Sequence, residues 1–247
     1  MGFAAWLAGV PIRAGDVDNH LGFLYHFRFT YREHGNHKAI RFGHLLEHLT
    51  GSREMRDLPL TPDRIGGSAG MDLLRSLGWS GEPYVALAFG TRVANKRWFP
   101  EEETWPRLAR LLMEQGFRIV WLGGPDEVPL GARLAALVPG SLDATGRTSI
   151  PEACAIQFHA YGTVAVDTGL AHTSAAAGRP TVTLFGPTIE SFVSPQGPHA
   201  LTLRPPAVDV TDGPTGTSEN GTHRLDPDRV ARLLHLLAGE TAPGTVA

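Results

Sequence analysis

From residue 84 onward, short apolar runs alternate with helical patterns, and this alternation constrains the fold of the chain more than any other feature. Four of the runs are rich in β-branched and aromatic residues and apolar on both faces, as strands inside a parallel sheet must be. They span residues 84–89, 117–122, 163–167 and 181–185, with helical patterns between them at about residues 102–115, 129–138, 150–161 and 170–177. Strand-helix alternation with short glycine-rich links predicts a Rossmann-like, doubly wound α/β domain over residues 82–247.

Local signals place some helix boundaries in this domain. Ser149 followed by Glu152 forms a capping box, which predicts a helix start at that point. Pro106 lacks a backbone N–H, so we expect its helix to begin at about Glu102 or later, where an unpaired donor is not needed. Apolar residues at helical spacing predict a last helix over residues 226–237.

The first third of the chain, residues 1–81, is irregular and predicts only a partial N-terminal domain. An amphipathic helix is expected at residues 38–49, ended by Gly51, and a second, glycine-interrupted helix is expected to end at Gly78. Residues 205–221 are rich in Pro, Gly, Thr and Asp and predict a long surface loop.

Composition excludes several classes of protein. The formal net charge of −3 and the lack of a long Lys/Arg block give no reason to expect nucleic acid as a partner. The single cysteine, Cys154, excludes an internal disulfide and a multi-cysteine metal site, and it fits a cytoplasmic protein. The first ten residues lack a basic segment and are too short for a membrane span, so we expect them to be folded structure.

The segment from Asp167 to Thr188 is the strongest candidate for a binding site. A predicted strand ends at Asp167, Gly169 makes a turn, and a helix of small residues follows. The first amides of such a helix have no helical partners and lie at the positive end of its dipole, which suits a diphosphate. A strand's carboxyl end is also where open α/β sheets bind ligands. On composition alone, a tightly packed helix with a polar cap is an equally good interpretation.

Two other polar loops follow predicted strands at the same edge of the sheet. Thr91 and Lys96 follow the first strand and could donate a hydroxyl hydrogen bond and a positive charge to phosphate oxygens. Glu127 follows the second strand and could accept a hydrogen bond from a ribose hydroxyl. Lys96 could equally belong to a solvated loop, and Glu127 could be a helix-start charge.

Two short motifs suggest other chemistry. His44, Glu47 and His48 match the H-x-x-E-H zinc pattern, so a zinc hydrolase remains a remote alternative, although no third ligand is evident. Asp16 and Asp18 resemble a metal-binding DxD motif but lie outside the clear sheet pattern, which favours a solvated turn.

The motifs of residues 82–247 resemble those of the ADP-heptose:lipopolysaccharide heptosyltransferases, which form glycosyltransferase family 9 and have the GT-B fold. The resemblance extends from about residue 4 to residue 237 and is strongest after residue 84. Its residues are Asp167-Thr168-Gly169-Leu170-Ala171-His172, Ala175-Ala176, Leu184-Phe185-Gly186-Pro187-Thr188, Lys96-Arg97-Trp98 and Gly123-Gly124-Pro125.

This resemblance implies a GT-B-like fold and a donor site for an ADP-sugar, such as ADP-heptose. By it, Thr91, Lys96 and the segment from Asp167 through Thr168, Gly169 and Leu170 to His172 contact the donor. Lys96 and the helix start would hold the diphosphate, with Glu127 near the ribose. The implied reaction inverts the anomeric centre, needs no metal or other cofactor, and transfers heptose or a related sugar to a lipid-linked, lipopolysaccharide-core-type acceptor. A cytoplasmic location with peripheral contact at the inner face of the inner membrane is consistent with that acceptor.

The chain departs from the family pattern in its first part. Family members begin with a complete Rossmann-like domain whose first strand leads to an Asp thought to act as general base, and no such strand and loop are recognisable here. The catalytic residue is therefore unassigned. A nucleotide-sugar-binding protein without transferase activity is the alternative that this departure leaves open, because a general base must reach the acceptor hydroxyl.

Overall fold

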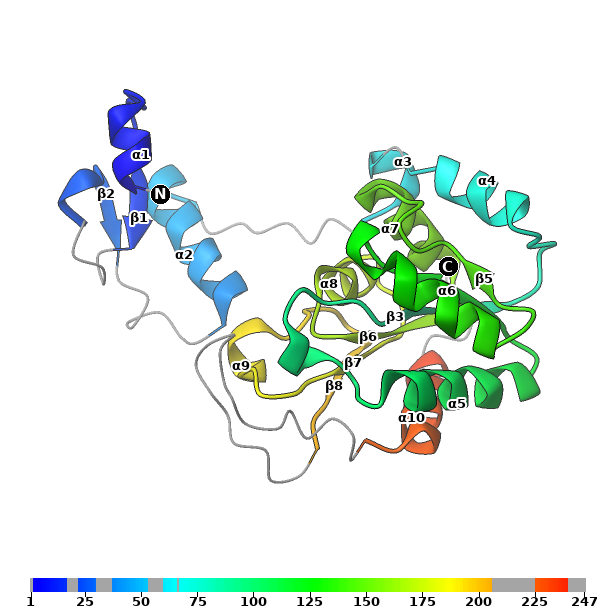
Figure 1. Ribbon diagram of the computed structural model, residues 1–247. Helices are drawn as coiled ribbons and strands as arrows, with labels where there is room; N and C mark the ends of the chain where they lie inside the picture. Colours follow the sequence, from blue (N-terminus) through cyan, green and yellow to red (C-terminus); the bar gives the residue numbers. More distant parts are fainter. Residues whose placement is uncertain are drawn as a thin grey trace. The chain divides into compact units, whose positions relative to one another are not determined.

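The computed structural model describes residues 2–16, 22–29, 37–52, 60–65, 67–205 and 225–239 (Figure 1). The chain forms two compact units, one of Met1–Leu58 with Ser191–Val193 and the other of Pro59–Glu190 with Ser194–Ala247. The second unit thus takes in helices that precede residue 81, while the predicted division into domains of residues 1–81 and 82–247 stays a prediction. The loop predicted after Pro205 lies outside the described residues.

The first unit is built from short elements. These are α1 (Gly2–Leu7), β1 (Ala14–Asp16), the 3-10 helix η1 (Gly22–Leu24), β2 (Phe27–Phe29) and α2 (Lys38–Thr50). Strands β1 and β2 pair in parallel, with Ala14 opposite Phe27. Helix α2 ends at Gly51, as predicted. The φ of Gly51 is 71°, a left-handed conformation that suits glycine, and the Gly51 N–H donates to the Glu47 carbonyl at 2.8 Å.

The second unit contains a six-stranded, fully parallel sheet in the order β5-β4-β3-β6-β7-β8. The strands are β3 (Tyr84–Ala88), β4 (Arg118–Leu122), β5 (Leu142–Asp143), β6 (Gly162–Val166), β7 (Thr181–Leu184) and β8 (Ala200–Leu203). Strands β3, β4, β6 and β7 are the four predicted runs, whereas β5 and β8 were not predicted. Numbered within the sheet, the order is 3-2-1-4-5-6, which is the Rossmann order.

Helices cover both faces of this sheet. Figure 1 shows α5 and α10 on one side of it and α4 and α7 on the other. The helices of this unit are α3 (Pro62–Ile65), α4 (Ala69–Ser76), α5 (Glu101–Glu114), α6 (Val128–Leu137), α7 (Ile150–His159), α8 (Gly169–Ala176) and α10 (Pro227–Gly239), with the short η3 (Ala94–Lys96) and η4 (Pro125–Glu127) in loops. Of the short helix α9 (Glu190–Val193), all residues but the first belong to the first unit. No helix in the described ranges is both long enough and apolar enough to cross a bilayer. The doubly wound α/β fold class is confirmed.

The two faces of β3 pack against cores of different composition. Val85 and Leu87 lie in the core shared with α5, α6 and α10, where Trp105 is fully buried. Ala86 and Ala88 lie in the core shared with α4, α7 and α8. Because alanine is small, the helices on this second face can pack close to the sheet. Each large side chain buried in such a core stabilises the fold by roughly 1.5–3 kcal/mol.

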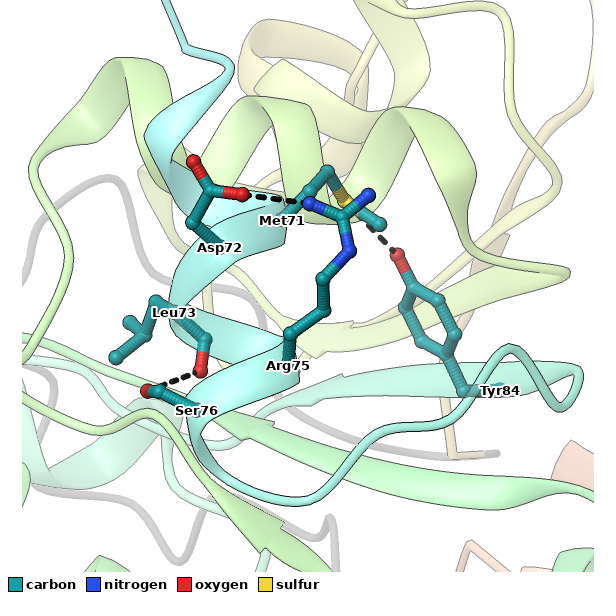
Figure 2. A network of polar contacts seen from close by, with 6 residues as sticks. All are labelled: Met71, Asp72, Leu73, Arg75, Ser76 and Tyr84. Atoms are coloured by element: carbon teal, nitrogen blue, oxygen red, sulfur yellow. Dashed lines mark hydrogen bonds and ion pairs between the residues drawn. The ribbon is translucent and has the colours of Figure 1, made fainter.

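Helix α4 packs against the first turn of α7 at very short range. A Cβ atom on Gly70 would lie 2.3 Å, and one on Gly67 2.2 Å, from carbonyl oxygens of that turn, so both positions require glycine. Tyr84 of β3 adds to this contact: its hydroxyl donates to the Ile156 carbonyl at 2.6 Å and lies 3.9 Å from the sulfur of Met71 (Figure 2).

Helix starts in the second unit agree with the sequence signals in one case and differ in another. The capping box at α7 is confirmed: Ser149 Oγ accepts from the Glu152 N–H at 3.4 Å, and Glu152 Oε2 accepts from the Ser149 N–H at 2.6 Å. Helix α5 begins at Glu101, earlier than expected, and Pro106 is its sixth residue. The proline ring therefore leaves the Glu102 carbonyl without the N–H that an ordinary helix would supply.

Candidate functional site

The candidate site lies at the carboxyl ends of β3 and β6, which are neighbours at the centre of the sheet. Their backbones are in register, with Ala88 opposite Ala165. From β3 the chain proceeds to β4 on one side, and from β6 to β7 on the other, so the strand order reverses between them. In open α/β sheets this reversal leaves a crevice outside the carboxyl ends of the strands, and ligands bind there.

An ion pair joins the loops that follow these two strands. Lys96, in η3 after β3, places its Nζ 2.6 Å from Oδ2 of Asp167, which follows β6. The side chains are only 18% and 6% exposed, so both charges are largely removed from water. A buried charge is costly unless it is paired, and each of these two charges therefore holds the other in position.

The first turn of α8 lies directly after Asp167. Ala171 N–H donates to the Thr168 carbonyl at 3.1 Å, which closes the turn, while Gly169 is exposed and has open space where a side chain would be. The Gly169 and Leu170 amides belong to the first turn of the helix, where N–H groups have no intrahelical acceptor. His172, on the same turn, is exposed. The turn thus offers backbone donors at the positive end of the helix dipole beside a paired lysine.

Thr91 and Glu127 both line a pocket of about 160 Å³ beside the same edge of the sheet. Thr91 is buried, and its Oγ1 accepts from the Val93 N–H at 3.3 Å. Glu127 Oε2 accepts from the Gly124 N–H at 2.8 Å, so this carboxylate caps η4, as one of the two interpretations of it expects. A Cβ on Gly90 would lie 2.4 Å from the Glu127 Cγ, so Gly90 allows this close approach of the loops.

The structure thus places the predicted donor-binding residues in two groups on one edge. The first group is Lys96 with Asp167 and the first turn of α8, and the second is Thr91 with Glu127. The assignment of these residues to an ADP-sugar stays a prediction.

The residues of the two possible metal-binding motifs, H-x-x-E-H and DxD, are only partly described by the structure. Glu47 lies in α2, but the side chains of His44 and His48 are outside the described part of the chain. Asp16 ends β1, and Asp18 is outside that part. The described residues contain no group of three or more His, Cys, Asp or Glu side chains placed to hold a metal ion.

A larger pocket, of about 420 Å³, follows β5 and was not predicted from the sequence. It is lined by Asp143, Thr145 and Arg147 among others, and Asp143 Oδ1 accepts from the Thr145 N–H at 3.0 Å. The sequence carries no periodic signal for it, because β5 has just two residues, of which only Leu142 is apolar.

Glu101 is a residue near the candidate site that was not predicted from the sequence. It lines the smaller pocket, and its side chain is 12% exposed with Oε1 3.8 Å from Nε of Arg97. Burial raises the pKa of Glu101, and the charge of Arg97 opposes that rise only partly.

Comparison with known proteins gives the family. The model of glycosyltransferase family 9 (heptosyltransferase) matches residues 20–208, which is more than half of the chain. The chain belongs to this family. Lipopolysaccharide heptosyltransferase 1 of Pseudomonas aeruginosa is 36% identical over 119 residues, a stretch that covers 47% of this chain and 32% of the relative. The chain spans less than half of the length of the curated family members that it matches first.

Solved structures of the family have the same fold. Escherichia coli ADP-heptose lipopolysaccharide heptosyltransferase II superposes with a TM-score of 0.76 over 97% of this chain and 73% of that one, at 20% identity. An Escherichia coli heptosyltransferase solved with ADP superposes with a TM-score of 0.63 over 87% of this chain and 61% of that one, at 22% identity. At this level of identity the likeness establishes the fold, and the GT-B-like class is confirmed.

Proposed function

We propose that this family 9 chain binds an ADP-sugar, in first place ADP-heptose, and transfers the sugar to a lipopolysaccharide-core-type acceptor. The observation that carries the proposal is the buried pair of Lys96 and Asp167 beside the first turn of α8, at the strand-order reversal. Family membership supports the reaction class. The relative solved with ADP supports the donor nucleotide.

The geometry suggests how a diphosphate would be bound and how it would be stabilised as the leaving group. Negative charge develops on the diphosphate as the bond from the sugar to its oxygen breaks. The Lys96 ammonium and the first amides of α8 would stabilise that charge in a preorganised way, because Asp167 already orients the lysine. This arrangement would neutralise charge without a metal ion, and it supports our proposal of metal-independent transfer. Inversion of the anomeric centre is proposed from the resemblance to the family alone.

The remaining predicted residues would act on other parts of the donor. Glu127 and Thr91 lie together at the end of β3 and β4, within reach of a ribose that extends from the diphosphate along this edge. His172 is exposed on the first turn of α8 and could donate to a phosphate oxygen. The lipid-linked glycan acceptor, and peripheral contact with the cytoplasmic face of the inner membrane, belong to the same proposal.

One observation favours a second candidate, a nucleotide-sugar-binding protein without transfer activity. The acceptor hydroxyl needs a general base within hydrogen-bond reach. Asp167 is a carboxylate at the strand-order reversal, but its Oδ2 already contacts the Lys96 ammonium at 2.6 Å and so does not face an acceptor hydroxyl alone.

Two measurements decide between these candidates. Calorimetry with the purified chain should detect binding of ADP, and absence of binding at millimolar ADP would rule out both candidates. A heptose-transfer assay with ADP-heptose and a lipopolysaccharide-core acceptor then separates them: turnover in the presence of EDTA supports the metal-independent transferase. ADP binding without turnover supports the binding protein.

A further inference from the structure

Gln157 is a fully buried polar residue that neither the sequence motifs nor the proposed chemistry uses. It lies in α7 among apolar neighbours and is 0% exposed. A leucine or methionine would fill the same volume without the cost of burying an amide. The physical question is therefore which groups the Gln157 amide satisfies.

The Gln157 side chain hydrogen-bonds to the first two turns of α8 through both its amide nitrogen and its amide oxygen. Nε2 donates to the Leu170 carbonyl at 2.7 Å, and Oε1 accepts from the Thr173 hydroxyl at 2.6 Å. The Thr173 hydroxyl also lies 3.0 Å from the same Leu170 carbonyl. The three groups form a closed network that ties the start of α8 to α7.

This network fixes the orientation of one peptide group in the turn. The Leu170 carbonyl and the Ala171 N–H belong to the same planar peptide unit. The carbonyl accepts from Gln157 Nε2 at 2.7 Å, and the N–H donates to the Thr168 carbonyl at 3.1 Å. With this unit held on both sides, rotation of the two preceding peptide units, which carry the Gly169 and Leu170 amides, is restricted.

We propose that Gln157 is a positioning residue for the diphosphate-binding turn: it anchors the Leu170 carbonyl, and so holds the first amides of α8 in place for the phosphate oxygens. This inference rests on the proposed function, because it presumes a diphosphate at the turn. Gln157 acts from behind the turn and touches no part of the donor itself. Preorganisation of this kind raises affinity by removing the cost of ordering the binding groups.

The test compares ADP affinity, local amide exchange and stability in three variants. Gln157→Met keeps the volume and removes both hydrogen bonds, and Thr173→Val removes the hydroxyl that completes the network. Thr163→Val is the matched control, because Thr163 is also fully buried and its hydroxyl has no hydrogen-bond partner among the described residues. Calorimetry gives the Kd for ADP, and hydrogen exchange reports on the amides of residues 168–173.

We expect Gln157→Met to weaken ADP binding about tenfold, as loss of a buried hydrogen-bond anchor would, and to speed exchange of the amides in this turn. Thr173→Val should shift both measurements in the same direction, and Thr163→Val should change neither. In Gln157→Glu, a protonated carboxyl can both donate and accept, so ADP affinity relative to the wild type should recover as the pH is lowered.

The outcomes are distinguishable. The positioning role alone is overturned if the wild-type chain binds ADP and if Gln157→Met and Thr173→Val leave both the ADP affinity and the amide exchange unchanged. If Gln157→Met does not fold, Thr173→Val and Gln157→Glu still decide the question. If the wild-type chain does not bind ADP, the proposed function fails and the positioning role fails with it.

Discussion

Lys96 and Asp167 carry opposite charges at a place where little water reaches either of them. Arg75 and Asp72 of α4 form a pair with the same 2.6 Å separation, but their side chains are 61% and 75% exposed (Figure 2). Water screens the exposed pair and leaves it with little net stabilisation. The difference in burial alone predicts that the two pairs contribute very differently to stability.

Lys96→Met should lower the free energy of unfolding by about 3 kcal/mol, because it leaves the Asp167 carboxylate buried and unpaired. Urea denaturation measures this change. The matched control is Arg75→Met, which removes a pair of equal length and should cost less than about 1 kcal/mol. Equal losses in the two variants would mean that the Asp167 site is open to water.

Sequence reasoning at the residue scale predicted which segments lie at the site but not their direct contacts. Lys96 and Asp167 each follow an apolar run, which places both at the carboxyl edge of a parallel sheet. Their pairing also needs β3 and β6 to be neighbours, and strand order does not follow from alternation alone. Gln157 was not recognised because a single amide in an apolar helix carries no pattern.

At the scale of elements, α7 supports α4 through its first turn and α8 through Gln157. Its capping box pairs the Ser149 and Glu152 N–H groups, and its first-turn carbonyls lie against Gly67, just before α4, and Gly70 within α4. The hydrogen bonds from Ser149, first from its backbone N–H and then from its hydroxyl, lower the pKa of the Glu152 carboxyl from its ordinary value of 4.5.

Glu152→Gln should reduce stability at neutral pH, by less than about 1 kcal/mol because the group is exposed. A carboxyl whose pKa is lower in the folded state stabilises the fold above its unfolded pKa, and this contribution disappears as the pH falls through the folded value. The difference between wild type and variant should therefore be present at pH 7 and vanish well below 4.5. Thermal unfolding measured across this range tests it. A difference that is constant with pH would contradict the role of the charge.

Gly70→Ala should destabilise the protein by about 1–3 kcal/mol, the usual range for overpacking. The added Cβ would lie 2.3 Å from a backbone oxygen of α7, which cannot move without displacing its helix. Gly239→Ala is the control, since a Cβ at that position, at the end of α10, would have no atom of the described residues within 4 Å beyond its chain neighbours and its own helix backbone. Chemical denaturation of both variants gives the comparison, and equal midpoints would show that α4 can shift freely.

The element boundaries show where sequence patterns are informative. The four runs with apolar residues on both faces were predicted because buried parallel strands require such residues. Strand β5 was missed because two residues carry no periodicity. Strand β8 was missed because its Ala200–Leu203 segment is only partly buried at the edge of the sheet and lacks a continuous apolar run. Helix α5 starts one residue earlier than expected, so Pro106 lies in its second turn, near the buried Trp105 and Leu108.

At the scale of the molecule, the proposed binding of a diphosphate would be linked to folding of the second unit. A diphosphate that binds only the folded chain should raise the melting temperature, because about 100-fold excess over Kd adds about 2.7 kcal/mol. For a chain of this size, we expect a shift of roughly 5 °C or more with ADP. AMP is the control, since it keeps the base and ribose but offers a shorter phosphate to Lys96 and α8. Differential scanning calorimetry measures both, and an equal shift with AMP would place the affinity away from the diphosphate turn.

The register between β3 and β6 also determines whether Lys96 and Asp167 lie close enough to pair. Slipping one strand by a single residue moves its end by about 3.3 Å, which exceeds the 2.6 Å that separates the Lys96 and Asp167 charges. Both strands are buried on each face, so their apolar character alone would penalise such a slip only weakly. The alternation of small and large side chains, and the ion pair just beyond the strand ends, therefore favour the observed alignment. The Lys96–Asp167 pair can thus contribute to the pairing of β3 with β6 as well as to the candidate site.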